Sequence, residues 1–586
     1  MCGIFGYVGI EQSVPQIVGT ALKSLEYRGY DSWGIVWQES DRLKTVKRIG
    51  RVPTTFTFEA MSRIAVGHTR WATHGGVTDA NAHPHLDSTG RIGIVHNGII
   101  ENDAELRASL SGSPIFASET DSETVAHLLG ERVAEGETIV EALSAVFPML
   151  HGQNAVIAID QREEVIAAAM NVSPLVIGAG EQGAFIASDP FALVGKAETM
   201  VIAPNNAVVR LDARGVTAFS YDGRELPLPN SHPVPDVSPD ELGDHSHFMA
   251  KEMAEQPSML RAQTMDEATV VRLSERIEAA NHVILTGCGS AYYAARIGAS
   301  WLTTISGKRT IAVAASEFDE VSPFLDDQTL VIAITQSGET ADILEAMRSA
   351  KTYGCPVVTL VNVMHSSAAR LADDVFPIMA GRERSVLATK SMIAMLARLL
   401  SAATRLRPTE VGASGMLPEL AQAMDDLSGS PAFAEFVSNV SKVIAQSEHV
   451  YIIGKGEGYG VAQEAALKIK EASYVHAEAF AAGELKHGAI ALVEPGTPCV
   501  VFATDRRFQT DTRSSAQELK SRGGYTIGIG LDIGVGAQTK LVLPDLGPAN
   551  ALLQVFVVQH IAFNVALLRN LDPDYPRNLA KSVTVK

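Results

Sequence analysis

The sequence is poor in three features that each mark a class of protein: cysteine, positive charge and uninterrupted apolar segments. Its four cysteines, Cys2, Cys288, Cys355 and Cys499, are scattered and form no CxxC pair. That spacing argues against a disulfide framework and the common zinc motifs, and a reducing cytoplasm is the expected location. The net charge of −19 argues against nucleic acid or an anionic membrane as the main partner.

No segment has the pattern of a secretory signal or of a membrane span. The start, MCGIFGYVGIEQS, lacks a basic region before its apolar run, and Glu11 ends that run early. The longest apolar tract, ANALLQVFVVQHIAFNVALLRN, is interrupted by Gln554, Gln559, His560 and Asn564. It predicts a helix that is buried or at an interface rather than one that crosses a membrane.

The first part of the chain reads as a mixture of short strands and helices. Strand patterns occur at RIAVGHT, RIGIVHNGII, NAVIAID, EVIAAAM and VVRLD. A helix is predicted at ETDSETVAHLLGERVAEG, with Asp121 or Ser122 as its N-cap. The following segment, ELPLPNSHPVPDVSPDELGD, holds five prolines from Pro227 to Pro239 and predicts a linker. A weaker break is LRPTEVGASGMLPEL.

The remainder contains an internal repeat. HVILTGCGSAYYAA from His282 and HVYIIGKGEGYGVA from His449 share His-Val, three residues and Gly-x-Gly-x-x-Tyr. TLVIAITQSGETAD from Thr329 and TPCVVFATDRRFQT from Thr497 keep nearly the same register, with offsets of 167 and 168 residues. Each copy is typical of parallel βαβ units. The predicted segments are a first domain at 1–225, a linker at 226–264, repeat domains at 265–405 and 435–575 with a linker at 406–434 between them, and a tail at 576–586.

One loop of the first copy predicts an anion site. TQSGET, residues 335–340, lies between an apolar strand and a helix pattern, and it gathers three hydroxyls and an amide around one glycine. Helix capping accounts for one hydroxyl but not for three. The second copy has TDRRFQT there, without glycine, so we expect one phosphate site per chain. GCGSAYYA lacks the third glycine of a dinucleotide fingerprint and is interpreted as a strand-to-helix turn.

Charged residues near the C-terminus have both an ordinary and a functional interpretation. Glu464, Lys468 and Glu471 are spaced i, i+4 and i+7, so one helix face carries acid, base and acid. A solvated salt-bridged face is the ordinary alternative, but the Ala-rich flanks favour a helix that packs. His487 is a structural or a functional histidine. Lys581 is a surface lysine or, in an apolar pocket, one that forms a Schiff base.

Cys2 directly follows the initiator methionine. Removal of Met1 would leave a free α-amine with a pKa of about 8, which can act as the base for the thiol of the same residue. Nucleophile and base would then lie in one residue. Such a chain start has to be fixed in a sheet, and the apolar GIFGYVG fits that requirement.

Two other motifs of the first domain are ambiguous. Asn97-Gly98 is either a hairpin turn or a pair of oxyanion donors. GHTRWATHG and NAHPHLD gather histidines, but the ligand spacing of a metal site is missing, so no metal is expected. These histidines are His68, His74, His83 and His85.

Together, MCGIFGYVG, LEYRGYDS, GHTRWATHG, NAHPH, VHNGIIEN and SETDSET resemble the N-terminal-nucleophile glutamine amidotransferase domain. GCGSAYYA, TQSGETAD, LKIKEASYVHAEAFAAGELKHG and RNLAKSVTVK resemble the sugar isomerase (SIS) domains of the glutamine–fructose-6-phosphate aminotransferase (isomerizing) family, and the match covers essentially the whole chain. The resemblance implies a multidomain α/β fold: an αββα glutaminase domain and two parallel-sheet α/β domains.

The resemblance also implies the activity of the family. It implies conversion of glutamine and fructose 6-phosphate to glutamate and glucosamine 6-phosphate, the first step of amino-sugar (UDP-N-acetylglucosamine) synthesis. It further implies a cytoplasmic homodimer with a shared active site and no cofactor.

Each matching residue of the first domain receives a role from the resemblance. Cys2 would attack the glutamine amide, form a thioester and release ammonia, while Asn97 and Gly98 stabilise the oxyanion. Arg70 would pair with the α-carboxylate of glutamine and Asp121 with its α-ammonium group. The full implied glutamine-binding set is Arg28 in a closing loop, Arg70, Trp71 as the gate of an ammonia channel, Thr73, His74 and Asp121.

The resemblance assigns the sugar chemistry to the second half. Lys581 would form a Schiff base at the ketose C2, Glu471 would move a proton between C1 and C2, and Lys468 would assist. His487 would open the sugar ring and reach the site of the neighbouring subunit. The residues implied to hold the sugar phosphate are Ser290, Thr335, Gln336, Ser337 and Thr340.

Three departures from the family pattern surround the sugar pocket. Gly289-Ser290-Ala291 replaces Gly-Thr-Ser, Thr335 replaces a serine, and SVLATKS replaces the Val-Ala-Ser-Thr-Lys pattern at 386–390. Two alternatives therefore stay open: an aminotransferase for another ketose phosphate, and a glutaminase whose second half only senses a sugar phosphate. The retained catalytic residues argue against the second. Loops typical of asparagine synthetase and of phosphoribosyl amidotransferases are not found.

Overall fold

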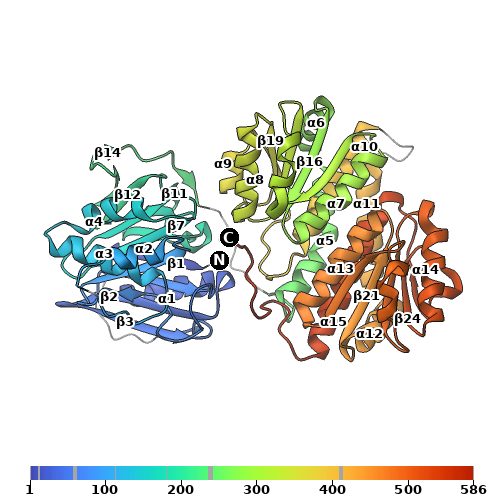
Figure 1. Ribbon diagram of the computed structural model, residues 1–586, viewed down its shortest axis with the longest axis horizontal. Helices are drawn as coiled ribbons and strands as arrows, with labels where there is room; N and C mark the ends of the chain where they lie inside the picture. Colours follow the sequence, from blue (N-terminus) through green and yellow to red (C-terminus); the bar gives the residue numbers. More distant parts are fainter. Residues whose placement is uncertain are drawn as a thin grey trace. The chain divides into compact units, whose positions relative to one another are not determined.

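The chain forms two compact units (Figure 1). The computed structural model describes residues 2–10, 13–56, 62–112, 114–180, 182–234, 242–407 and 413–584. The first unit comprises Met1–Glu241 together with Ala580–Lys586, and the second comprises Leu242–Leu579.

The first unit is a sandwich of two antiparallel sheets with helices on its outer faces (Figure 1). Helix α1 (Val14–Leu25) packs on the first sheet, and α3 (Ser122–Ala134) and α4 (Ile139–Val146) pack on the second. The first sheet, in the order β15-β11-β9-β10-β1-β4-β2-β3, consists of β1 (Gly3–Gly9), β2 (Ser32–Glu39), β3 (Arg42–Ile49), β4 (Ile64–Arg70), β9 (Val176–Gly180), β10 (Gly183–Ala187), β11 (Thr199–Ile202) and β15 (His232–Pro233). The second, in the order β14-β13-β12-β8-β7-β6-β5, consists of β5 (His85–Leu86), β6 (Ile92–Gly98), β7 (Asn154–Asp160), β8 (Ile166–Met170), β12 (Ala207–Asp212), β13 (Gly215–Ser220) and β14 (Glu225–Leu226).

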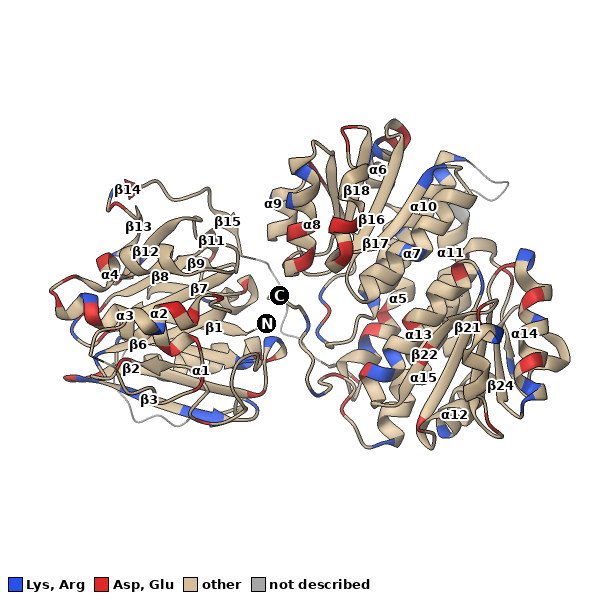
Figure 2. Ribbon diagram, in the orientation of Figure 1, with Lys and Arg blue, Asp and Glu red and all other residues tan. Residues whose placement is uncertain are grey.

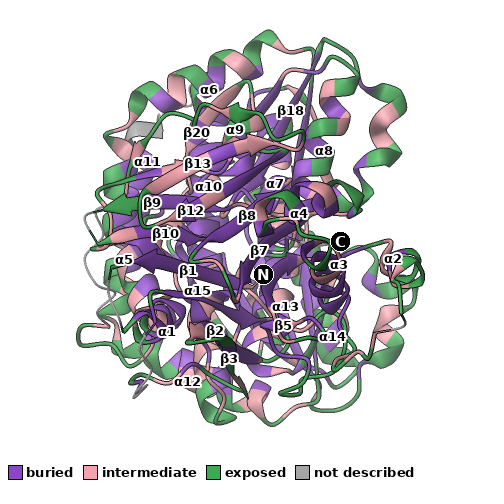
Figure 3. Ribbon diagram, turned by 90° about the vertical axis from the view of Figure 1, so that its left-hand side faces the viewer, coloured by how far each residue is buried: buried purple, intermediate pink, exposed green. Residues whose placement is uncertain are grey.

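Alternating side chains build the layers of this unit. In β1, Ile4 and Val8 pack between the two sheets, whereas Phe5 and Tyr7 pack toward α1. Because successive residues of a strand point to opposite faces, an apolar strand can serve two cores at once. The expected αββα arrangement and all five strands predicted for this domain are confirmed. Strands β4, β6, β7 and β8 are almost entirely buried, and Figure 3 shows buried strands such as β7 beside helices with exposed outer sides.

The second unit contains two parallel sheets with the same strand order, which confirms the internal repeat. The charged side chains lie mainly on the surrounding helices and loops (Figure 2). The first sheet runs β17 (Arg309–Ala314), β16 (His282–Gly287), β18 (Thr329–Thr335), β19 (Val357–Val361) and β20 (Asp374–Pro377). The second runs β22 (His476–Ala481), β21 (His449–Gly454), β23 (Pro498–Ala503), β24 (Tyr525–Gly530) and β25 (Thr539–Val542).

The repeat extends to backbone angles. The turn after β16 leads through Gly289 (φ 55°, ψ −128°) into α7 (Ser290–Thr304), and the turn after β21 leads through Gly456 (φ 60°, ψ −129°) into α13 (Glu457–Ser473). This backbone region is accessible to glycine and strained for other residues. The predicted strand-to-helix turn therefore occurs in both copies.

One buried cluster joins the two copies. Helices from both copies contribute to it, and α7 packs against α13. The helices that complete this unit are α5 (Phe248–Thr264), α6 (Glu267–Ala279), α8 (Ala341–Thr352), α9 (Ser367–Leu371), α10 (Lys390–Leu406), α11 (Ala413–Ser428), α12 (Pro431–Ala445), α14 (Gln509–Ser521) and α15 (Asn550–Leu568).

Helix α15 contains the long apolar tract. Within the described residues, Gly547–Leu568 is long and apolar enough to cross a membrane, but 78% of its apolar window is buried in the protein. A core helix passes the same test of length and composition. The predicted buried helix is confirmed.

Both expected linkers contain helices. Helix α5 lies inside 226–264 and α11 inside 406–434, and both pack against each other. Part of the Pro-rich segment, 235–241, lies outside the described residues. Beyond α15, the Asp574 carboxylate accepts from the amides of Phe248 and Met249, at 2.8 Å each, at the start of α5. The tail before Ala580 is thereby tied to the second unit.

Candidate active sites

Cys2 lies directly before strand β1, and its thiol contacts the residue after β4. The Trp71 amide donates to Cys2 Sγ at 3.3 Å, and the thiol donates to the Trp71 carbonyl at 3.6 Å. The next residue is fixed in the sheet, because the Gly3 amide donates to Thr69 Oγ1 at 3.1 Å. The reactive side chain is thus carried by an anchored chain start rather than by a frayed one.

Asn97 and Gly98 end strand β6 and still pair with β7, so they do not form a hairpin turn. The Asn97 side-chain Nδ2 donates to the Cys2 carbonyl at 3.0 Å. Gly98 has φ +146°, and a Cβ there would lie 2.3 Å from the Gln153 carbonyl oxygen. Glycine is therefore required at this position. The amide donor and the thiol residue meet although they come from different sheets.

Arg28 is buried beside Cys2. Its Nε donates to the Cys2 carbonyl at 3.3 Å, and its Nη1 forms an ion pair with Asp189 at 2.8 Å. Tyr27 also donates to Asp189, and burial together with that carboxylate raises the pKa of Tyr27. In this structure Arg28 supports the backbone of Cys2, and its role in a loop that closes over glutamine stays a prediction.

Arg70 ends β4 and holds the loop that follows. Its guanidinium donates to the carbonyls of His74, Gly75 and Gly76 at 2.5, 3.2 and 3.1 Å. Thr73 and His74 are exposed in that loop. The loop is thus organised by the residue that the resemblance places at the glutamine α-carboxylate.

Asp121 precedes α3 and faces the end of β6. Its Oδ2 accepts from the Ile100 amide at 2.7 Å, and the Ser122 hydroxyl donates to its other oxygen at 3.4 Å. An ionised carboxylate has acceptor capacity beyond these two bonds. Such a group can accept a hydrogen bond from an ammonium group.

His68, His83 and His85 are buried hydrogen-bonding groups, whereas His74 is exposed. The rings of His68 and His83 stack with centroids 4.1 Å apart. Burial lowers the pKa of His68 to about 3 and lowers the pKa of His83 and His85 well below the usual value. Among the described residues, no group of three or more His, Cys, Asp or Glu side chains could hold a metal ion.

On the acid–base–acid face of α13, Glu464 and Lys468 are buried and Glu471 is half-buried. Lys468 Nζ lies 3.8 Å from Glu464 Oε1 and also binds Glu471. Burial alone would lower the pKa of Lys468, but the two carboxylates raise it, and the net shift is upward. Burial raises the pKa of Glu464 to about 7, against the opposing effect of Lys468. The ordinary alternative, a solvated salt-bridged helix face, is therefore wrong.

Ser290, which follows the strand next to that of the predicted phosphate loop, contacts this cluster. Ser290 Oγ donates to Glu464 Oε1 at 3.1 Å, which links the first copy to α13. Strands β16 and β18 are parallel neighbours, so the loops after them meet at their carboxyl ends. The structure therefore brings Ser290, the 335–340 loop, Lys468 and Glu471 toward one region of the second unit.

The 335–340 loop is tight and capped by its own hydroxyls. The Gly338 amide donates to Thr335 Oγ1 at 3.1 Å, and the Glu339 amide donates to Ser337 Oγ at 3.2 Å. Gly338 has φ +70°, and a Cβ there would lie 2.0 Å from Ser366 Oγ. Gln336, Ser337 and Thr340 are half-buried ahead of helix α8. Hydroxyl and amide groups at a helix N-terminus suit an anion.

Two other predicted catalytic residues belong neither to α13 nor to the 335–340 loop. His487 ends the short helix Leu485–His487 and is exposed. Lys581 belongs to the segment Ala580–Lys586 of the first unit, so it is not brought together with α13 inside one unit. Their roles stay predictions.

Sequence reasoning missed several partners of these residues. Glu464 was recognised on the helix face but received no role, although its spacing to Lys468 was visible. Asp189, which holds Arg28, follows a strand far along the chain and gave no local signal. Glu383 acts on the charge of Lys468 from the first copy, and it too is identified only by the folded structure.

The second copy carries an acid where the first carries Ser290. Glu457 is 5% exposed, and burial, reinforced by Asp505, raises its pKa from 4.5 to about 8. The folded state therefore binds this proton more tightly than the unfolded chain. The contribution of Glu457 to stability is complete below pH 4.5 and is lost as the pH rises through about 8.

The free energy of unfolding of the wild type should fall between pH 5 and pH 9 as Glu457 loses its proton. We expect this fall to be smaller in Glu457→Gln, by on the order of a few kcal/mol at pH 9. Thermal unfolding at both pH values measures the effect. The exposed Glu448→Gln is the control and should keep the wild-type pH dependence. An equal slope for Glu457→Gln and the wild type would contradict the expectation.

Both halves of the chain are similar to known protein families. The glutamine amidotransferase domain family matches residues 68–195, and the SIS domain family matches 276–405 and 443–569. The glutamine–fructose-6-phosphate aminotransferase (isomerizing) of Symbiobacterium thermophilum is 37% identical over 617 residues, and that of Thermus thermophilus is 38% identical over 611. Both alignments cover 100% of this chain and 100% of the relative.

Solved structures match the second half. The C-terminal domain of glucosamine-fructose-6-phosphate aminotransferase from Francisella tularensis is 27% identical, covers 58% of this chain and 100% of its own, and has a TM-score of 0.51. Tagatose-6-phosphate ketose/aldose isomerase from Escherichia coli, at 21% identity with 58% and 98% coverage and a TM-score of 0.51, shows the shared fold. On the full-length matches, this chain belongs to the glutamine–fructose-6-phosphate aminotransferase (isomerizing) family.

Proposed function

We propose that this protein converts glutamine and fructose 6-phosphate into glutamate and glucosamine 6-phosphate. The observation that carries the proposal is that two groups of polar and reactive side chains occur in one chain with full-length relatives of that name. One group surrounds the thiol of Cys2, and the other is the buried acid–lysine–acid cluster of α13. This reaction would supply the first step of amino-sugar synthesis.

In the glutaminase step, the Cys2 thiolate attacks the amide carbon of glutamine after its proton passes to the α-amine of the same residue. The Asn97 Nδ2 and the Gly98 amide stabilise the oxyanion. Collapse of the tetrahedral intermediate releases ammonia and leaves a thioester, which water hydrolyses to glutamate. Arg70 binds the α-carboxylate of glutamine, and Asp121 binds its α-ammonium group. Further contacts to glutamine come from Trp71, Thr73 and His74.

In the synthase step, the 335–340 loop and Ser290 bind the phosphate, and His487 opens the sugar ring. Lys581 condenses with the C2 ketone and releases water, and ammonia then displaces the lysine to leave an imine at C2. Glu471 removes a proton from C1 and returns one to C2, which gives the amino sugar. The Lys468 ammonium forms an ion pair with the Glu471 carboxylate and holds it in place.

The proposal includes a cytoplasmic homodimer in which each subunit contributes to the site of the other. Its support is that His487 is exposed in a short helix and that the resemblance assigns it to a neighbouring site. Sedimentation at working concentrations tests the dimer, and complementation between a His487→Ala subunit and a Glu471→Gln subunit tests the shared site.

The first experiment is mass spectrometry of the products from glutamine plus fructose 6-phosphate, with each substrate alone as control. Amino-hexose phosphate in equal amount to glutamate supports the proposal. Glutamate without amino sugar would contradict it and would indicate another acceptor. Ala291, Thr335 and the 386–390 segment are the observations that favour a different ketose phosphate, so a panel of ketose phosphates follows in that case.

A separate prediction concerns the 335–340 loop. Ser337→Ala removes a half-buried hydroxyl from the loop, and we expect the KM for the sugar phosphate to rise by about tenfold with kcat changed less than about threefold. Steady-state kinetics with glutamine in excess measures this. Ser349→Ala, further along α8, is the matched control and should resemble the wild type. An unchanged KM for Ser337→Ala would remove this residue from the site.

A further inference from the structure

The glutaminase site is assembled across the gap between two sheets. Cys2 precedes β1 of the first sheet, whereas Asn97 ends β6 of the second. Oxyanion stabilisation depends on a donor held within a few tenths of an ångström of its productive position. A side chain that connects the two sheets at this point therefore bears directly on catalysis. His68, on β4 of the first sheet, makes that connection.

The contacts of His68 determine which ring nitrogen carries its proton. Nε2 lies 3.0 Å from the His96 carbonyl oxygen and 3.1 Å from Asn97 Oδ1. A carbonyl oxygen can only accept, so Nε2 must be the donor. The ring is buried, and burial lowers its pKa to about 3, so it stays neutral at physiological pH. Its proton is therefore on Nε2.

This donor fixes the orientation of the Asn97 amide. With Oδ1 toward His68, Nδ2 points to the Cys2 carbonyl at 3.0 Å. In the flipped amide, Nδ2 would face the donor of His68 and Oδ1 would face the carbonyl of Cys2, so both contacts would be repulsive. The two neighbours together select the orientation that offers a donor on the side of Cys2.

Packing alone does not explain a histidine here. His68 Nδ1 is buried without a hydrogen-bond partner among the described residues, which is costly and uncommon for a polar atom in a core. The ring instead stacks on His83, with centroids 4.1 Å apart and planes at 19°. The hydrogen bonds of the ring are therefore those made by Nε2.

We propose that His68 is a positioning residue that orients the Asn97 side-chain amide as the oxyanion donor for glutamine hydrolysis. The inference rests on the glutaminase half of the proposed function and adds a residue to it. His68 does not touch the substrate, and it acts through Asn97.

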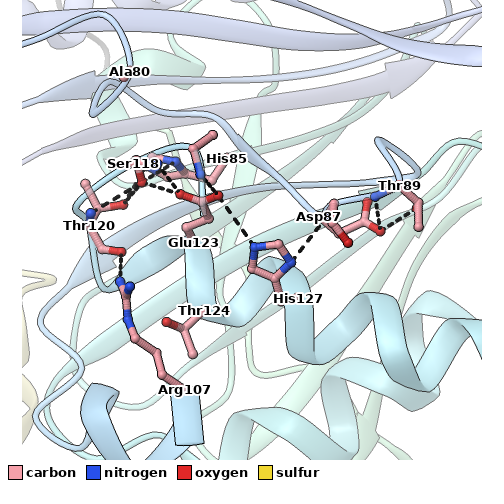
Figure 4. A network of polar contacts seen from close by, with 12 residues as sticks. Ala80, His85, Asp87, Thr89, Arg107, Ser118, Thr120, Glu123, Thr124 and His127 are labelled. Atoms are coloured by element: carbon pink, nitrogen blue, oxygen red, sulfur yellow. Dashed lines mark hydrogen bonds and ion pairs between the residues drawn. The ribbon is translucent and has the colours of Figure 1, made fainter. Parts of the chain in front are cut away.

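The test compares three variants of the full chain. We expect His68→Leu, which removes the donor, to lower kcat for glutamine hydrolysis by about 10²-fold, the scale of one lost oxyanion donor, with KM changed less than about threefold. His68→Gln keeps an N–H near the position of Nε2 and should recover most of this loss. His127→Leu is the matched control, because His127 is a buried histidine of the same unit that contacts Glu123 and the Ser88 amide instead (Figure 4).

A double-mutant comparison separates positioning from general packing. In an Asn97→Ala background, His68→Leu should cost less than about twofold more, because the group through which it acts is gone. A loss as large as in the wild-type background would overturn the proposal, and so would a His68→Gln variant no better than His68→Leu. Wild-type protein that fails to hydrolyse glutamine would instead overturn the proposed function, and that measurement comes first.

A spectroscopic measurement keeps the proposal testable if His68→Leu does not fold. The 15N spectrum of histidine-labelled wild-type protein, assigned through the signal lost in His68→Gln, reports the tautomer directly. A neutral ring protonated on Nε2 supports the proposal. A ring protonated on Nδ1, or an imidazolium at pH 7, would overturn it.

Discussion

Cys2→Ala should abolish glutamine hydrolysis, with a fall of more than about 10⁴-fold, while synthesis of amino sugar from fructose 6-phosphate and added ammonia continues. In the proposed mechanism this thiol is the nucleophile, and the residual rate of an enzyme without its nucleophile comes from binding and oxyanion stabilisation alone. The second unit keeps its own buried cluster on α13 and does not contain Cys2. The two activities are therefore expected to separate.

The measurement is glutamate release from glutamine alone, followed by amino-sugar formation with ammonium chloride at pH 8 to 9. Cys499→Ala is the control, because Cys499 is a buried cysteine of strand β23 in the other unit. Hydrolysis above one-hundredth of the wild-type rate in Cys2→Ala would exclude this thiol as the nucleophile. Fully active protein that retains Met1 would exclude the α-amine as its base.

Glu471→Gln should produce the opposite separation. We expect amino-sugar formation to fall by about 10³-fold, within the usual range for a lost general base, with glutamine hydrolysis within about twofold of wild type. The amide keeps the shape of the side chain but cannot accept a proton from C1. It also leaves Lys468 with one carboxylate partner fewer inside the protein, so this variant needs a stability measurement beside the kinetics.

Exchange of the C1 hydrogen of fructose 6-phosphate with deuterated solvent measures the step most directly. Glu478→Gln is the matched control, because Glu478 is an exposed carboxylate on strand β22, a few residues beyond α13. Retention of more than one-tenth of the wild-type exchange rate in Glu471→Gln would assign the proton transfer to another group. Glu464, with its pKa raised to about 7, would then be the next residue to replace.

Local patterns were sufficient for most of the secondary structure but not for helix α5. Apolar residue patterns predict the strands of the first unit, and matching strand–glycine–helix segments predict the repeat. Helix α5 buries polar residues, including Glu252, Gln256 and Gln263, and holds Pro257. The side-chain amide of Gln263 donates to the Ile378 carbonyl, and that of Gln256 donates to Gln559, both far away in the sequence. No apolar periodicity marks such a helix in the sequence.

The candidate sites divide in the same way. Short sequence segments are sufficient to find several candidate residues. These are Cys2, the Asn97-Gly98 pair, the TQSGET loop and the spaced pair Lys468 and Glu471. Which groups surround them is a property of contacts between remote segments. Ser290 reaches Glu464 across 174 positions, and Arg28 reaches Asp189 across 161.

The order of the domains, the repeat, the candidate nucleophile and the helix face that carries acid and base can be found in the sequence, because each depends on neighbours a few residues apart. The burial of Glu464 and Lys468, the support of Cys2 by Arg28 and the contact of His68 with Asn97 appear only in the folded chain. Burial and hydrogen bonding depend on which sheets and helices pack together, and that packing sets the charge of Glu464 and the orientation of a single amide.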